Sequence, residues 1–128
     1  MVKTPAEKWK DSIINYRKKC QKIIKVSKNV RYSGVINAYG RTLTGIVRPD
    51  VTPLLKSEQI KNEFFILSTL MNLRKDVTNA VGKLTYVLLE HQNVSIVIFQ
   101  KNDMTFYVSI DGKAKDVKLI ISKIKKLI

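Results

Sequence analysis

Apolar residues recur at helical spacing in three segments of the chain, one in the middle and one near each end. The middle segment, residues 57–81, is the longest and contains neither proline nor glycine. Ser57 is a suitable N-cap, and Gly82 stands where a left-handed C-cap residue is expected, so we predict one helix over the whole segment. Its two apolar stripes are Ile60, Phe64, Leu67 and Met71, and Ile66, Leu70, Leu73 and Val77. Two stripes indicate that the helix is covered on two sides.

Both terminal segments are amphipathic, with a basic polar face. Thr4, Pro5 and Glu7 form the N-cap, first-turn proline and capping-box pattern of a helix start. The apolar stripe that follows runs to about Val26 and contains Trp9, Ile13, Tyr16, Cys20 and Ile23. After Gly112, the last helix has a predicted buried face of Val117, Ile120, Ile121, Ile124, Leu127 and Ile128. Each terminal helix therefore has one side that can pack on a sheet.

Five β-rich runs lie between these helices. The first two, residues 30–37 and 42–48, flank a turn in which Gly40 supplies the positive φ of a tight hairpin. Gly34 and Gly45 lie inside these runs, where glycine marks a bulge or a close approach by another element. Three more runs follow the central helix, at residues 84–90, 94–100 and 104–110. The short polar connectors between them predict an antiparallel meander.

The predicted order is helix, two strands, helix, three strands, helix. The economical assembly is an α+β fold with one five-stranded antiparallel sheet, the long central helix on one face and the terminal helices on the other. The run at residues 94–100 is apolar on both alternating faces apart from Ser95, as expected of an interior strand. A chain of 128 residues is long enough for a core of its own, so we expect a single domain over residues 1–128.

Positive charge is concentrated at the two ends of the chain. The net charge is +14, from 24 Lys and Arg against 10 Asp and Glu, and residues 32–111 are almost neutral. If both terminal helices cover the same face of the sheet, their outward sides form a basic surface that attracts polyanions. The candidates for that contact are Lys10, Arg17, Lys18, Lys22, Lys25, Lys118 and Lys125. The alternative is that these side chains only solvate the helices, and the sequence leaves both readings open.

The type of basic residue narrows this hypothesis. Lysine outnumbers arginine, and a lysine is a point charge rather than a bidentate fork. Contact with phosphates of a nucleic acid, or with headgroups of an anionic membrane surface, is therefore favoured over base reading. Exposed aromatic rings among the lysines would favour nucleic acid. We expect Trp9 and Tyr16 in the core, however, and only Tyr39 at the hairpin tip exposed.

Residues 33–45, with Gly34, Gly40 and Gly45 among alternating apolar positions, resemble the opening hairpin of the Roadblock (dynein light chain) domains. These are profilin-like modules related to longin domains, and the order of elements agrees with theirs. The runs at residues 86–90 and 94–99 are also similar to those of short archaeal proteins of this kind. The resemblance implies a non-enzymatic module that dimerises through the third strand and the central helix. It also implies a scaffold or regulator for small GTPases.

The sequence itself gives a reason to expect a homodimer. An apolar edge strand is a hazard that proteins pair or cover. Pairing two copies of the third strand across a two-fold axis would extend the sheet and bring two central helices together. The interface candidates are Ile66, Leu70, Leu73, Val77, Leu84, Tyr86 and Leu88. The alternative is that the loop at residues 49–56 covers these side chains within one chain.

Residues that suggest catalysis are scarce. His91 is the only histidine and lies in a predicted hairpin tip, and Cys20 lies on an apolar stripe, where free cysteine behaves as a small hydrophobe. The sequence contains no C-x-x-C, H-E-x-x-H or phosphate-loop motif. We therefore expect no enzymatic activity, no catalytic residue, no metal site and no cofactor.

The same observations bear on location and on the choice of function. The lone cysteine, the polar N-terminus and the lack of an apolar run of about 18–20 residues predict a cytoplasmic protein without a transmembrane segment. The first hypothesis is a homodimeric interaction or regulatory module with a protein partner. The second is a sequence-nonspecific nucleic-acid-binding protein. The third is a small-ligand sensor, for which the sequence shows no buried polar cluster.

Overall fold

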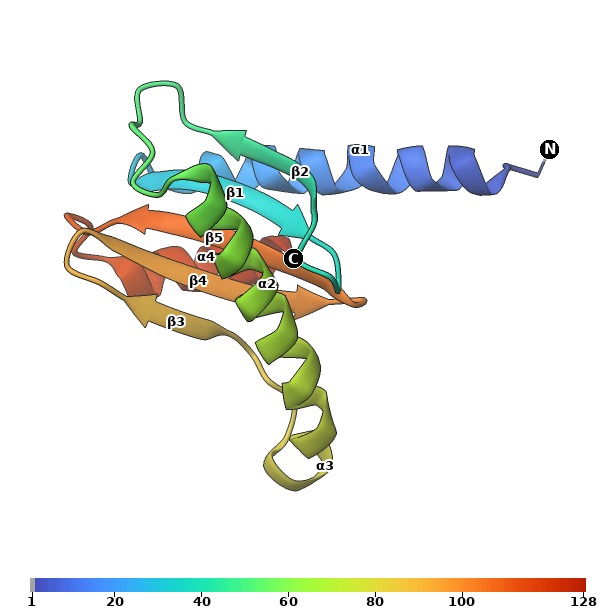
Figure 1. Cartoon of the computed structure of the whole chain (residues 1–128). Helices are drawn as coiled ribbons and strands as arrows, with labels where there is room; N and C mark the ends of the chain where they lie inside the picture. Colours follow the sequence, from blue (N-terminus) through green and yellow to red (C-terminus); the bar gives the residue numbers. More distant parts are fainter. Residues whose placement is uncertain (1) are drawn as a thin grey trace.

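In the computed structural model, which describes residues 2–128, the chain forms a five-stranded antiparallel sheet with helices on both faces (Figure 1). The strand order is β2-β1-β5-β4-β3. The strands are β1 (Val30–Ile36), β2 (Thr42–Val47), β3 (Val87–Glu90), β4 (Val94–Lys101) and β5 (Met104–Asp111). The helices are α1 (Pro5–Ile24), α2 (Ser57–Arg74), the short 3-10 helix η1 (Lys75–Val77), α3 (Thr78–Val81) and α4 (Val117–Leu127). The predicted α+β fold and the order of its elements are confirmed.

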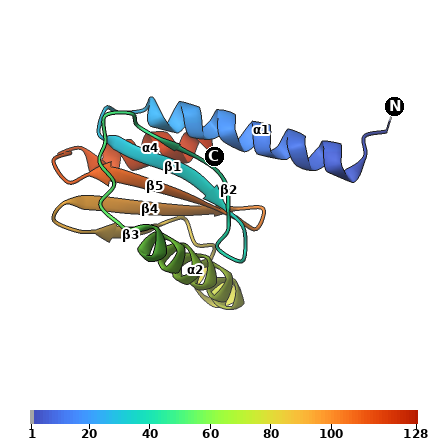
Figure 2. The same ribbon diagram turned by 45° about the horizontal axis from the view of Figure 1, so that its top comes forward.

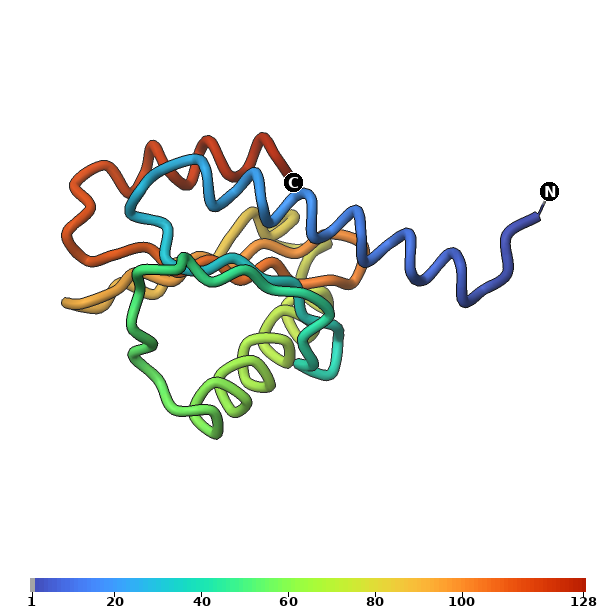
Figure 3. Tube along the Cα trace, turned by 90° about the horizontal axis from the view of Figure 1, so that it is seen from above, coloured from blue at the N-terminus to red at the C-terminus, as the bar shows by residue number. Residues whose placement is uncertain are grey.

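The helices divide between the two faces of the sheet as predicted. Seen from above, α1 and α4 lie on one side and α2 lies on the other (Figure 3). The strands alternate so that β4 and β5 bury side chains on both faces. This double coverage explains why the central strands are apolar throughout.

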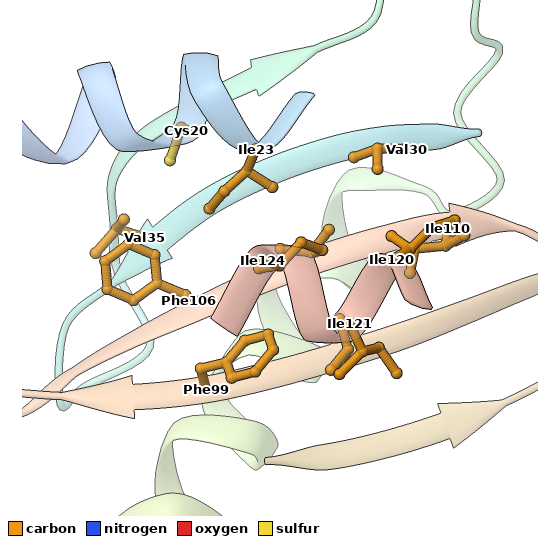
Figure 4. Close-up of a cluster of buried hydrophobic side chains, with 12 residues drawn as sticks. Cys20, Ile23, Val30, Val35, Phe99, Phe106, Ile110, Ile120, Ile121 and Ile124 are labelled. Carbon is orange, nitrogen blue, oxygen red and sulfur yellow. The ribbon is translucent and has the colours of Figure 1, made fainter. Parts of the chain in front are cut away.

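Each face of the sheet has its own apolar core. Figure 4 shows the core under the terminal helices, where Ile23 of α1 and Ile120 of α4 meet Phe106 and its neighbours from the sheet. The ring of Tyr16 packs edge-on against Phe106, with centroids 5.9 Å apart. The core under α2 is formed by Ile36, Phe64, Leu67, Met71, Ile96, Ile98 and Tyr107. Tyr16 and Cys20 therefore lie in the core, as predicted.

The two glycines within the strands of the first hairpin leave room for a side chain that lies against their backbone. Gly34 and Gly45 are paired directly across β1 and β2. A Cβ atom at either position would lie 2.3 Å from the hydroxyl oxygen of Tyr32, because that side chain lies across both residues. The predicted close approach is confirmed, and Tyr32 is the residue that makes it.

The central helix is shorter than the predicted segment. α2 ends at Arg74 and continues through the 3-10 turn into α3, where the β-branched residues Val77 and Thr78 disfavour a regular helix. The N-cap is Lys56 rather than Ser57, and its backbone N–H donates to Gln59 Oε1 at 2.9 Å. Gly82 has the expected positive φ of 88°, but its ψ of 172° is extended and not left-handed helical. A single helix over residues 57–81 with Ser57 as N-cap was thus wrong in detail.

β3 is also shorter than predicted. It begins at Val87, whereas the sequence pattern placed the strand start at residue 84. Residues 82–86 instead connect α3, which lies away from the sheet, to the first paired residue of β3 (Figure 1). Leu84 packs on the core under α2 and Tyr86 packs against Phe99, with ring centroids 6.0 Å apart. Their side chains contact the sheet, but their backbone is outside it, so the predicted strand start was wrong.

The first half of α1 extends beyond the sheet (Figure 2). The predicted capping box at its start is present, with Thr4 and Glu7 bonded to each other's backbone. Contact with the core begins only at Tyr16. Trp9 is therefore 59% exposed, and the expectation that it is a core residue was wrong. The apolar stripe of α1 simply continues past the point where the sheet ends.

Candidate functional site

The outward side of α2 is an apolar surface on an otherwise well-packed helix. Phe64, Leu67 and Met71 are buried against the sheet. On the other side, Ile66 is 61% and Leu73 is 62% exposed. The loop at residues 49–56 leaves both side chains uncovered, so the alternative that it covers the second stripe was wrong at these two positions.

The other predicted dimer residues lie close to this surface or at the neighbouring sheet edge. Leu70 and Val77 are half-buried on α2 and η1. Tyr86 is exposed just before β3, and Leu84 is half-buried. Leu88 packs on the core under the terminal helices, which is the opposite face of the sheet from α2. The structure therefore brings the helical candidates together but separates Leu88 from them.

Sequence reasoning missed Phe65, which is 60% exposed beside Ile66. Phe65 belongs to neither apolar stripe, and a large apolar residue off both stripes was the signal that could have identified it. We define the outer face of α2 as Phe65, Ile66, Leu70 and Leu73. Exposed apolar patches of this kind mark interaction surfaces in soluble proteins.

The opening hairpin packs against one side of this helix. Asn72 Nδ2 of α2 donates to the carbonyl oxygen of Ala38 at 3.1 Å. Gln100 Nε2 of β4 donates to Asn72 Oδ1 at 3.4 Å, so one amide side chain joins the hairpin, the helix and the sheet. Tyr39 at the hairpin tip is exposed, as predicted. The outer face of α2 is therefore held on a fixed scaffold.

The seven basic candidates are all exposed. Since α1 and α4 lie on the same face of the sheet, the condition for a shared basic surface is met (Figure 3). Lys10 is on the half of α1 that extends beyond the sheet, while Lys118 and Lys125 are on α4. Arg17 Nη1 donates to Thr44 Oγ1 of β2 at 3.3 Å, so its guanidinium is partly engaged in holding α1.

The salt bridges among the described residues involve none of these seven candidates. They join Lys3 to Asp11, Arg31 to Asp111, and Lys75 to Asp103. The positive charges of the candidates are therefore not offset by an acidic neighbour within contact distance. Uncompensated charges on one face raise the local potential toward polyanions.

A cavity of about 280 Å³ lies on the α2 side of the sheet, beneath the first turns of α2 and the loop that precedes it. Its walls come from β1, β2, β4, β5, the loop and α2. The lining residues are Arg31, Tyr32, Thr42, Val47, Val51, Pro53, Leu54, Leu55, Ile60, Phe64, Val94, Ile96, Tyr107 and Ser109. Arg31 is the one charged residue in this lining.

Burial raises the pKa of three side chains, Cys20, Tyr32 and Tyr107, and so favours their protonated forms. It raises the pKa of the Cys20 thiol, so this cysteine is not an activated nucleophile. It raises the pKa of Tyr32 to about 12. Burial, and the hydrogen bond that the Tyr107 hydroxyl donates to Glu63, also raise the pKa of Tyr107. His91 is exposed just after β3.

Residues 2–128 show neither a metal-binding cluster nor a membrane-spanning helix. No cluster of three or more His, Cys, Asp or Glu side chains in this range is arranged to hold a metal ion. None of the helices described for this range combines the length and hydropathy of a membrane-spanning segment.

Comparison with solved structures identifies the fold. No protein-family model matches the chain, and no curated protein matches it in sequence. The gliding protein MglB from Thermus thermophilus is similar in structure, with a TM-score of 0.68, 9% identity, and coverage of 90% of this chain and 86% of that chain. A Roadblock/LC7 domain from Streptomyces avermitilis has a TM-score of 0.63, 11% identity, and coverage of 85% and 88%. A structure described as MglB with tetrameric arrangement has a TM-score of 0.66, 11% identity, and coverage of 88% and 85%. This chain therefore has the fold of the Roadblock/LC7 domains.

Proposed function

We propose that this protein is a non-catalytic homodimeric interaction module, with residues 1–128 as a single domain. The observation that carries the proposal is the outer face of α2, where Phe65, Ile66 and Leu73 are more than half exposed. Burying large apolar side chains contributes about 1.5–3 kcal/mol each. Several such side chains from each copy would offset the cost of association, which is about 4–15 kcal/mol.

The edge of the sheet supplies the second part of the interface. β3 pairs only with β4, so its other edge has backbone groups without a strand partner in the described chain. A second copy of β3 would satisfy those groups across a two-fold axis. The similar MglB structure described as tetrameric supports self-assembly as a property of this fold. The dimer would present its sheet and helices to a protein partner, and the Roadblock resemblance implies a small GTPase as the class of partner.

The double variant Ile66→Glu, Leu73→Glu is expected to convert the dimer to a monomer. Two carboxylates placed in an apolar interface lose their hydration without gaining partners, which disfavours association. Light scattering coupled to gel filtration measures the mass, and circular dichroism checks that the fold is retained.

The matched control is Leu119→Glu, which changes an exposed leucine on α4, on the opposite face of the sheet. It should leave the dimer intact. A wild-type protein that is monomeric at about 100 µM, or a double variant that stays dimeric, would refute the interface. A dimer that does not form at this concentration has an association free energy weaker than about −5.5 kcal/mol.

The basic surface of the terminal helices supports a second candidate function, contact with a polyanion. Two observations favour it. The helices α1 and α4 cover the same face of the sheet. Their candidate lysines are exposed and take part in none of the salt bridges among the described residues. Such a surface would bind phosphates without reading bases.

Binding to a generic DNA duplex is expected to weaken steeply as salt concentration rises. Each phosphate contact adds about −0.9 to the slope of log affinity against log salt. The triple variant Lys18→Glu, Lys22→Glu, Lys118→Glu should lower the affinity at least roughly tenfold and make the slope shallower. Fluorescence anisotropy with a labelled duplex gives both quantities, and anionic liposomes serve as the membrane counterpart.

The control carries the same change of charge on the other face of the sheet. Lys56, Lys61 and Lys83 are exposed on or next to α2 and α3. Their replacement by Glu should affect binding much less than the change on the terminal helices. Equal losses in both triple variants would show a nonspecific effect of net charge. Absence of binding to duplex and liposomes at physiological salt would exclude polyanions as partners.

A further inference from the structure

The cavity beneath the first turns of α2 has an almost entirely apolar wall. Ile60 of α2, Leu55 of the loop and Ile96 of β4 are among the aliphatic residues that line it. Three aromatic rings form one corner, since Tyr107 makes edge-on contacts with Phe64 at 4.8 Å and with Tyr32 at 5.9 Å between centroids. The hydroxyl of Tyr107 is already bonded to Glu63, which leaves its ring as an apolar part of the wall.

Two contacts hold the elements that surround the cavity. Tyr32 lies across two paired glycines and is fixed in place by them. The loop is tied to β1, because Arg31 Nη2 donates to the carbonyl oxygen of Thr52 at 2.7 Å. Figure 3 shows the loop and the first turns of α2 curving away from the sheet, whereas the later part of α2 packs on it through Leu67 and Met71. The space is therefore a built feature of the fold.

The size of the cavity sets the size of its occupant. An apolar cavity of about 150 Å³ binds benzene. A volume of about 280 Å³ therefore has room for an apolar molecule nearly twice as large, such as a fused two-ring system. Binding pockets for small molecules combine a wall of this kind with a few polar groups that fix orientation.

Arg31 is the charged group in this wall, and its positive charge indicates that the ligand carries a negative one. Of the five N–H donors of its guanidinium, one on Nη2 bonds to Thr52, and Nη1 forms the salt bridge with Asp111 Oδ2 at 3.7 Å. At 3.7 Å this ion pair is too long for a hydrogen bond, so Arg31 keeps N–H donors from which a second carboxylate can accept. We propose that this cavity binds a small, mainly apolar carboxylate. This inference does not depend on the dimer or on the basic helices.

The test uses 2-naphthoate as the probe, with amide and methyl NMR spectra of the uniformly labelled full chain. We expect saturable shifts with a dissociation constant on the order of 100 µM, as the size of the probe allows. The shifts should map to cavity residues such as Tyr32, Ile60 and Ile96. The neutral analogue 2-naphthalenemethanol should bind at least roughly threefold more weakly, because it cannot accept a charge-assisted bond from Arg31.

Filling the cavity is expected to abolish binding. Ser109 lines it from the central strand β5, so Ser109→Leu places an isobutyl group in the space without removing any core contact. The matched control is Ser122→Leu, the same change at an exposed position on α4, and it should leave the affinity unchanged. Retention of the melting temperature by both variants shows that each is folded.

Three outcomes would overturn the proposal. The first is the absence of saturable shifts at millimolar probe, and the second is equal affinity for the carboxylate and the alcohol. The third is a map of shifts on the outer face of α2 or on the terminal helices, which would assign the binding to those surfaces.

Discussion

Alanine at position 40 is expected to destabilise the protein by about 3 kcal/mol. Gly40 has a φ of +80°, which costs an L-residue about 1–2 kcal/mol. A Cβ atom there would also lie 2.7 Å from the Cα atom of Phe65, which is helix backbone and cannot rotate away. The hairpin would have to move off α2, and the hydrogen bond between Asn72 and Ala38 would be strained with it.

Gly82→Ala separates the two contributions. Gly82 has a similar φ of +88°, but nothing lies within 4 Å of a Cβ atom built there. Its replacement should therefore cost only the backbone strain of a positive φ with an extended ψ, about 1–3 kcal/mol. Urea denaturation followed by circular dichroism measures both values. Equal losses in the two variants would mean that the hairpin does not press on α2.

Truncation of Phe106 to alanine should have a still larger effect, a loss of about 3–5 kcal/mol in the free energy of unfolding. Phe106 is fully buried in the core under the terminal helices (Figure 4). It lies on β5, the middle strand of the sheet, and its ring supports Tyr16 of α1. The variant would lose apolar burial, leave a cavity and loosen the attachment of α1.

The companion variant is Tyr39→Ala, which removes an aromatic ring from the exposed tip of the first hairpin. A surface change of this kind should alter stability by no more than about 0.5 kcal/mol. The same urea titration compares the two variants. A Phe106 variant that loses less than about 1.5 kcal/mol would contradict the packing described for this core.

The layers of this fold could be predicted from the sequence because they follow from local periodicity. The apolar stripes of α1 and α4 each need one face of a sheet to pack on. The strand at residues 94–100, which is apolar on both faces, needs a covering layer on each side of the sheet. Gly40 could be assigned to the turn for a similar reason, since turn chemistry is local. The contact between Gly40 and the backbone of Phe65 could not be predicted, because it depends on how the hairpin is placed against α2.

The misassigned residues all depend on where one element ends relative to another. The stripe of α1 gives no sign of where the sheet stops, so Trp9 was placed in the core. Leu84 has the alternation of a strand residue, but the strand pairing begins only at Val87, so its backbone lies outside β3. The small-ligand hypothesis allowed for a pocket between sheet and helix, but its place and lining could not be predicted, because they depend on how α2 diverges from the sheet. The expected dimer and polyanion contacts stay predictions.

The extension of α1 beyond the sheet places a built-in fluorophore outside both cores. Trp9 is the only tryptophan of the chain, its side chain is largely exposed, and it belongs to neither core of residues 2–128. Its emission spectrum therefore reports fraying of the helix end, or its burial against another surface, and is silent about the loss of tertiary structure elsewhere. The five tyrosines, of which all but Tyr39 contact core residues, carry the optical signal of global unfolding instead.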